Sequence, residues 1–132
     1  MEPTLVRKSR NGTTVVFMHG VLSSIEGAWF SPRGGFWPRL LCDDTLLSDV
    51  GVYLFGYRAD VFAGTYSLDD AVDSMREYFR LDSIWLEKQL IFVCHSMGGI
   101  LARRFLVSEQ AEIIHSMLVR LTHTPPRGSV CL

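Results

Sequence analysis

The chain has 132 residues, a formal net charge of −1 and a hydrophobic content of 48%. This length suits one domain with a hydrophobic core. The small charge gives no basic footprint for nucleic acid, and no apolar stretch is long enough to span a bilayer. The three cysteines (Cys42, Cys94 and Cys131) are odd in number and widely spaced, which predicts neither a disulfide framework nor a zinc site. Because the N-terminal residues also lack a signal-peptide pattern, a cytoplasmic protein is expected.

Strand and helix patterns alternate along the chain after an N-terminal extension over residues 1–12. Apolar and β-branched runs predict strands at 13–19, 50–57, 89–94 and 117–122. Helical patterns lie between them, at 36–41, from Ser67 onward and at 98–107. Ser67 can cap the second of these helices. This alternation predicts an α/β fold with a parallel sheet of about four strands and flanking helices, in one domain over residues 13–132.

The order of the strands across the sheet decides where a ligand would bind. Doubly wound sheets place ligands beyond the carboxyl ends of their strands, where the strand order reverses. If the order is second, first, third, fourth, as the fold class suggests, that point lies between the first and third strands. The segments that follow these strands, at 19–21 and 95–97, would then meet at one site.

A serine stands at a sharp strand-to-helix turn in residues 91–101 (IFVCHSMGGIL). The known form of this turn is G-x-S-x-G, the nucleophile elbow, which lifts a serine out of the backbone. Here it is CHSMG, with Cys94 in place of the first glycine. Because cysteine is small and commonly buried, Cys94 is interpreted as a packing residue. Ser96 is the candidate nucleophile, and Gly98 would let the helix start directly against the sheet.

Acyl transfer by a serine needs a base and N–H donors for the developing oxyanion. The N–H of Met97, at the start of the helix, is one candidate donor. The second is the N–H of Val21, because Gly20 lets the backbone approach closely there. His19 is expected to shape this loop. Strand alternation predicts that His95 points away from the serine and packs or hydrogen-bonds beneath the elbow.

These features resemble the α/β-hydrolase superfamily, and most of all its lipase-like serine esterases, the group related to GPI-inositol deacylases. The resemblance covers residues 13–110 and rests on HG at 19–20, WP with a following leucine at 37–40, GY at 56–57 and HSMGG at 95–99. It implies a truncated α/β-hydrolase fold and a serine hydrolase of carboxylic esters, lipid-like ones included. It also implies Ser96 as nucleophile, an oxyanion hole from Val21 and Met97, and no cofactor or metal.

The acid and the histidine of the family's triad are missing from this chain. Relatives place both after strands later than the fourth, in the order Ser, acid, His. His123 is expected at the carboxyl end of the fourth strand, but residues 122–129 (THTPPRGS) resemble a T-P-H-x-G-S turn of relatives in which Pro126 takes the place of the histidine. Asp60 is interpreted as a solvated loop carboxylate, and His115 as a surface residue.

Two classes of function remain open. One is a serine hydrolase of a small-molecule or lipid ester; the other is a catalytically inactive truncated domain that serves as a binding or interaction module. A nucleotide-binding module is disfavoured because neither G-x-x-x-x-G-K-[ST] nor G-x-G-x-x-G occurs. In the loop 22–35, Trp29 and Phe30 suit acyl-chain binding and ordinary packing equally. An open sheet edge predicts self-association.

Overall fold

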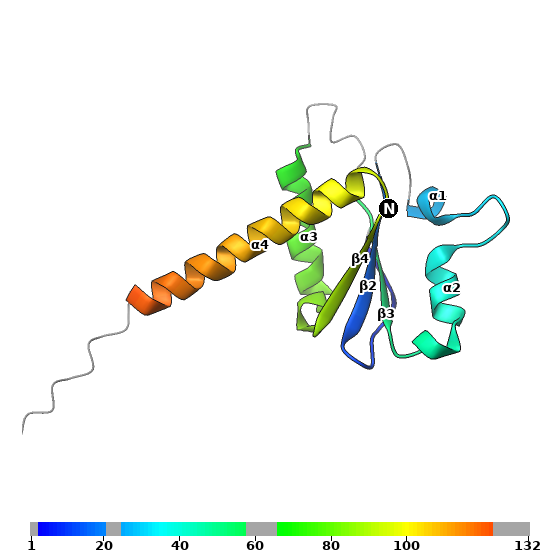
Figure 1. Ribbon diagram of the computed structural model, residues 1–132. Helices are drawn as coiled ribbons and strands as arrows, with labels where there is room; N and C mark the ends of the chain where they lie inside the picture. The colour runs from blue at the N-terminus through cyan, green and yellow to red at the C-terminus, as the bar shows by residue number, and fades with distance from the viewer. Residues whose placement is uncertain (1–2, 21–24, 58–65, 123–132) are drawn as a thin grey trace, which may run out of the picture.

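A computed structural model of the chain describes residues 3–20, 25–57 and 66–122. It has an α/β fold in which a four-stranded mixed sheet lies between two layers of helices (Figure 1). The strands are β1 (Thr4–Arg7), β2 (Thr13–Met18), β3 (Gly51–Phe55) and β4 (Gln89–Cys94). The helices are α1 (Ile25–Trp29), α2 (Trp37–Asp43), α3 (Leu68–Leu81) and α4 (Met97–Thr122), with 3-10 turns η1 (Thr45–Leu47) and η3 (Ile84–Leu86).

The strand order is β1-β3-β2-β4. β2 pairs in parallel with β3 on one side and β4 on the other, so the first three expected strands lie in the expected order. The prediction of a purely parallel sheet is wrong, because β1 pairs antiparallel with β3. β1 lies inside the segment interpreted as an extension. Its Arg7 holds it in place by donating to the carbonyls of Cys42, Leu47 and Val50 at 2.7–2.8 Å.

The fourth predicted strand is also wrong, because residues 117–122 form the end of α4. This helix runs for 26 residues and contains no glycine or proline after Gly99. A short apolar run cannot be assigned to strand or helix by its periodicity alone. Two of the apolar side chains that suggested a strand, Met117 and Leu118, are exposed on the helix. β4 therefore forms an edge of the sheet.

Each face of the sheet packs against one hydrophobic cluster, because successive side chains of a strand point to opposite faces. On one face, Val16, Met18, Tyr53 and Phe55 lie in the larger cluster, under α3 and α4. On the other face, a smaller cluster lies under α1 and α2 and contains Val15, Phe17, Trp29, Val52 and Leu54. The sheet is thus covered on both faces around β2 and β3.

α3 begins with the cap that the sequence predicts. The Ser67 side chain accepts the N–H of Asp70 at 3.1 Å, and the Asp70 carboxylate accepts the N–H of Ser67 at 2.7 Å. Together these contacts form a capping box. The backbone hydrogen bond from Ser67 lowers the pKa of Asp70, so the cap keeps its charge at neutral pH.

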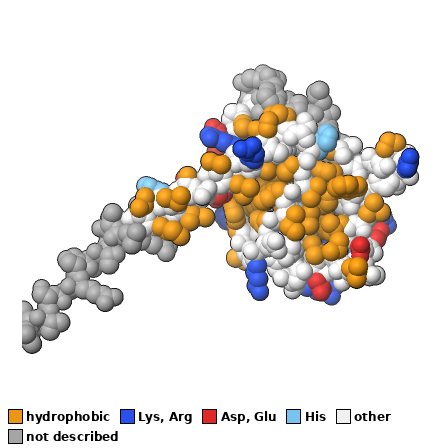
Figure 2. Space-filling view, in the orientation of Figure 1, with side chains coloured by type: hydrophobic (Ala, Val, Ile, Leu, Met, Phe, Trp, Pro, Cys, Tyr) orange, Lys and Arg blue, Asp and Glu red, His pale blue; other side chains and the backbone are white. Residues whose placement is uncertain are grey.

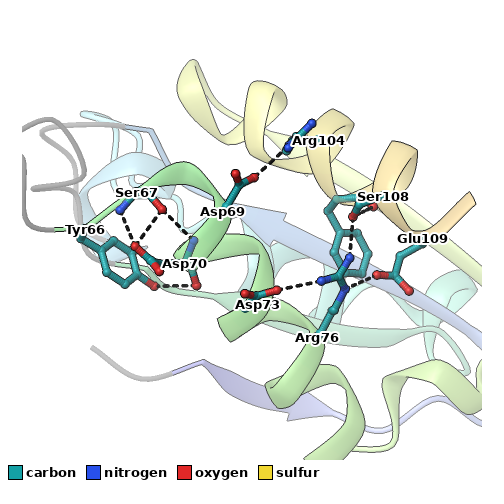
Figure 3. A network of polar contacts seen from close by, with 10 residues as sticks. Tyr66, Ser67, Asp69, Asp70, Asp73, Arg76, Arg104, Ser108 and Glu109 are labelled. Atoms are coloured by element: carbon teal, nitrogen blue, oxygen red, sulfur yellow. Dashed lines mark hydrogen bonds and ion pairs between the residues drawn. The ribbon is translucent and has the colours of Figure 1, made fainter. Parts of the chain in front are cut away.

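Polar side chains tie α3 to α4 (Figure 3). Arg76 on α3 forms an ion pair with Glu109 and donates to the Ser108 hydroxyl at 2.9 Å. Nearer the start of both helices, Arg104 pairs with Asp69 at 2.9 Å. These contacts fix the direction in which α4 leaves the turn at the end of β4.

A buried tyrosine should make the fold sensitive to alkali. The Tyr53 hydroxyl donates to the Asp82 carboxylate at 2.6 Å, and burial, followed by this hydrogen bond, raises the pKa of Tyr53 far above its usual range. Unfolded tyrosine loses its proton near pH 10, so above that pH the unfolded state binds fewer protons and the free energy of unfolding falls as pH rises. Tyr53→Phe should lower the free energy of unfolding by about 2 kcal/mol at pH 7. It should also make the decrease of that free energy above pH 10 less steep. Urea unfolding from pH 7 to 11 measures both, and an unchanged slope would contradict the assignment.

Hydrophobic side chains gather over β4 and α2, and others follow α4 (Figure 2). Ile91 is 42% exposed, Trp37 57% and Leu40 56%. A groove of about 310 Å³ lies here, lined by Phe17, Trp37, Leu40 and Val93 among others. Among the helices that the structure describes, none has both the length and the apolar character needed to cross a membrane.

Candidate functional site

The carboxyl ends of the three parallel strands β2, β3 and β4 lie at the same end of the sheet, and the candidate residues follow these strands. His19 and Gly20 come after β2, Tyr57 follows β3, and His95 and Ser96 follow β4. The N–H of His95 donates to the Met18 carbonyl at 3.0 Å. This bond extends the pairing of β2 with β4 by one residue and holds the segment before Ser96 against the end of β2.

Ser96 has the backbone conformation that a nucleophile elbow requires. Its φ is +51°, in the left-handed region that residues other than glycine rarely occupy. β4 ends two residues before it, at Cys94, and α4 begins immediately after it, at Met97. The side chain is exposed. The strand, turn and helix that the motif predicts are therefore all present, and the serine stands where they meet.

Two glycines allow the elbow to pack against the end of β2. A Cβ atom on Gly98 would lie 2.6 Å from the Met18 carbonyl oxygen and 2.8 Å from that of His19. A Cβ atom on Gly20 would lie 2.8 Å from the Ser96 Cβ and 3.0 Å from the His95 carbonyl oxygen. Side chains do not fit at such distances, so both positions need glycine because of close contact with their neighbours.

His19 is 3% exposed and lies against the Tyr57 ring, with 4.6 Å between the ring centres. Its Nδ1 is 2.9 Å from the Gly20 carbonyl oxygen. The sequence predicts that His19 shapes the loop after β2; the structure describes that segment only as far as Gly20. Val21, the expected oxyanion donor in that loop, lies outside the described residues.

His95 differs from its expected position. Its side chain is exposed, and its Nδ1 would be 3.1 Å from a Cβ atom on Gly20. The imidazole therefore lies beside Gly20, at the surface, and is not packed beneath the elbow. The reason is the backbone pairing of His95 with Met18, which continues the strand, so that His95 follows Ile91 and Val93 on the less covered face of β4.

Cys94 is half-buried, and its Cβ lies 3.8 Å from the position of a Cβ atom on Gly99. Burial raises the pKa of the Cys94 thiol. A thiol that keeps its proton is a poor nucleophile. These observations support the interpretation of Cys94 as a packing residue under the turn.

The first turn of α4 provides an environment for negative charge beside Ser96. The N–H groups of Gly98 and Gly99 donate to the carbonyls of His95 and Ser96 at 3.0 Å. Met97 is the first residue of α4, and the first N–H of a helix has no partner within the helix. The helix dipole adds a partial positive charge at this end. An anionic oxygen next to the serine would meet the Met97 N–H, as the sequence predicts.

Among the described residues, no acid or base is hydrogen-bonded to the serine. In the part of the chain that the structure describes, no hydrogen bond reaches the Ser96 hydroxyl, and no group of three His, Cys, Asp or Glu side chains could hold a metal ion. His115 lies exposed on α4, as expected of a surface residue. Asp60 and His123 lie outside the described residues.

The two aromatic residues of the loop 22–35 take different positions. Trp29 is 8% exposed and packs edge-on against Phe17, with 5.1 Å between ring centres. Phe30 is 57% exposed and borders a hollow of about 190 Å³ together with Trp29, Ser31 and Trp37. Trp29 is therefore a packing residue. Apolar surface that could bind an acyl chain is presented by Phe30 and by Trp37, which the sequence analysis did not consider for this role.

The comparisons with known proteins give no relative. A scan against family models finds no match. Searches of curated proteins and of solved structures find none either. The chain is thus described by its α/β fold and by the geometry around Ser96.

Proposed function

We propose that this chain is a serine hydrolase of the α/β-hydrolase type that acts on carboxylic esters, lipid-like ones included, with Ser96 as its nucleophile. The observation that carries the proposal is the positive φ of Ser96 at the turn between β4 and α4. Backbone strain of this kind costs about 1–3 kcal/mol and persists where the surrounding structure maintains it. Here the backbones at Gly20 and Gly98 pack so closely against the turn and the end of β2 that a side chain would not fit at either position, and this packing supports the Ser96 conformation.

The chemistry follows from this placement. The Ser96 oxygen attacks the ester carbonyl carbon, and the carbonyl oxygen gains negative charge. The Met97 N–H and the start of α4 stabilise that charge; one such donor is worth about 3 kcal/mol of barrier. The serine proton must pass to a base, which the described residues do not supply. The proposal therefore assigns the nucleophile and one oxyanion donor.

Imidazole added to the solution can take the place of the base in a test. A fluorophosphonate probe reacts when the Ser96 oxygen bonds to phosphorus, fluoride leaves and the proton passes to imidazole. We expect one covalent adduct per chain, at Ser96, at a rate that rises with imidazole concentration and is close to zero without it. Intact-mass and peptide-mapping spectra measure the adduct and its position.

Ser96→Ala should abolish the adduct. Ser83→Ala is the matched control, because Ser83 is the other serine with positive φ (+59°) among the described residues and lies after α3, away from the elbow. It should leave labelling unchanged. If the folded chain acquires no adduct at Ser96 at any imidazole concentration, the hydrolase proposal fails. That result would favour the alternative of a catalytically inactive binding module.

We also propose that the chain self-associates through the edge of β4. The strand carries no charged residue from Gln89 to Cys94, and charges are a usual means of blocking an edge. At the opposite edge, β1 has an irregular register between Leu5 and Arg7, which impairs pairing.

Ile91→Lys should shift the chain toward monomer, because the lysine would place a charge on the exposed surface of β4. Light scattering coupled to gel filtration over a range of concentrations measures the shift. Leu81→Lys is the control, since Leu81 is 59% exposed at the end of α3. A wild-type chain that is monomeric at all concentrations would contradict the proposal.

A further inference from the structure

Tyr57 contacts His19 in three ways. Its hydroxyl donates to the His19 carbonyl at 2.8 Å, and its backbone N–H donates to His19 Nε2 at 3.3 Å. The two rings also stack, with 4.6 Å between their centres and 14° between their planes. Residues from the ends of β2 and β3, 38 positions apart in sequence, are thereby joined on the side of His19 that faces away from β4.

These contacts define the state of the His19 ring. A backbone N–H can only donate, so Nε2 must be the unprotonated, accepting nitrogen. In the neutral ring the proton is then on Nδ1, which donates to the Gly20 carbonyl at 2.9 Å. This bond ties the His19 ring to the carbonyl of Gly20, the last described residue before the position whose N–H the sequence predicts as the second oxyanion donor.

The same backbone supports the elbow from its other side. The His19 carbonyl that accepts the Tyr57 hydroxyl is also 2.8 Å from the position of a Cβ atom on Gly98. A Cβ atom on Gly20 would lie equally close to the Ser96 Cβ. A movement of His19 would therefore displace both Gly20 and the packing of Gly98 against the end of β2.

We propose that Tyr57 is a positioning residue, which acts through His19 to hold the end of β2, together with Gly20, against the turn that carries Ser96. This inference rests on the proposed hydrolase function. Tyr57 does not need to touch the substrate for this role. Burial raises the pKa of the Tyr57 hydroxyl, so the donor remains protonated at neutral pH and the contact persists under assay conditions.

The test compares Tyr57→Phe and Tyr57→Leu in the imidazole-assisted labelling of Ser96. Phenylalanine keeps the stacked ring and loses only the hydroxyl, whereas leucine loses both. We expect the maximal labelling rate constant to fall about tenfold for Tyr57→Phe, which corresponds to about 1.4 kcal/mol, and further for Tyr57→Leu. The probe concentration that gives half-maximal rate should stay unchanged, because probe binding does not involve Tyr57.

Tyr53→Phe is the matched control. It removes a buried tyrosine hydroxyl from the same segment, one that bonds to Asp82 and makes no contact with His19. It should lower stability without changing the labelling rate constant of the folded protein. Normal labelling in Tyr57→Phe would overturn the inference and leave the hydrolase proposal standing. If the wild-type chain never labels at Ser96, both the hydrolase proposal and the inference about Tyr57 fail.

The wild-type protein offers a second measurement that does not depend on how the variants fold. Nitrogen-15 correlation spectra distinguish the two neutral tautomers of histidine. We expect His19 to carry its proton on Nδ1 at neutral pH. A proton on Nε2, or a charged ring, would show that the Tyr57 N–H does not bind there, and would overturn the inference.

Discussion

Gly98→Ala is expected to lower the free energy of unfolding by about 3 kcal/mol, the upper range for overpacking a tight site. The added methyl group would lie 2.6 Å from the Met18 carbonyl oxygen and 2.8 Å from that of His19. Both atoms belong to backbone at the end of β2, which is paired on both sides. Neither can move without disturbing the sheet, so α4 must shift away from it and take the Ser96 turn along.

Gly99→Ala is the matched control one residue later in the same helix. Its methyl group would meet the Cys94 Cβ at 3.8 Å, an ordinary contact. Because alanine favours helix over glycine by about 1 kcal/mol, this variant should be neutral or stabilised by up to that amount. Urea unfolding of the two variants gives both values. Equal stabilities would contradict the close approach of α4 to β2.

The sequence predicted the central elements because their patterns are local. The β-branched run of β2, the apolar run of β4 and the Ser67 cap of α3 each lie within one short segment. β1 was missed because its four residues show no alternation, and because Arg7 holds it through contacts about 35–43 positions away. The end of α4 was misassigned because its exposed apolar residues resemble a buried strand in sequence.

The candidate site also contains some residues that local sequence predicts and others that it does not. Ser96, Met97 and Gly98 belong to one continuous motif, so their arrangement could be predicted from its spacing. The stacking of His19 on Tyr57 joins residues 38 positions apart, and no local pattern indicates it. The exposure of His95 depends on which face of β4 the helices leave open, which follows from the layers of the fold.

Phe79→Ala should have the largest effect on stability, a loss of about 4 kcal/mol. Phe79 is fully buried on α3. Its ring centre lies 5.4–6.4 Å from those of five aromatic residues: Tyr53, Phe55, Trp85, Phe92 and Phe105. These neighbours come from β3, η3, β4 and α4, which cannot all move inward to fill the space, so a cavity remains.

Phe79→Leu should cost less than about 1.5 kcal/mol, since it keeps most of the volume, and Leu81→Ala, at an exposed site on the same helix, about 0.5 kcal/mol or less. Chemical unfolding ranks the three variants. Because Phe105 lies on α4 and Phe92 on β4, the cavity also loosens the two elements that meet at Ser96. Phe79→Ala should therefore slow imidazole-assisted labelling even in its folded fraction. A Phe79→Ala cost near that of Phe79→Leu would mean that this cluster does not hold α4 against the sheet.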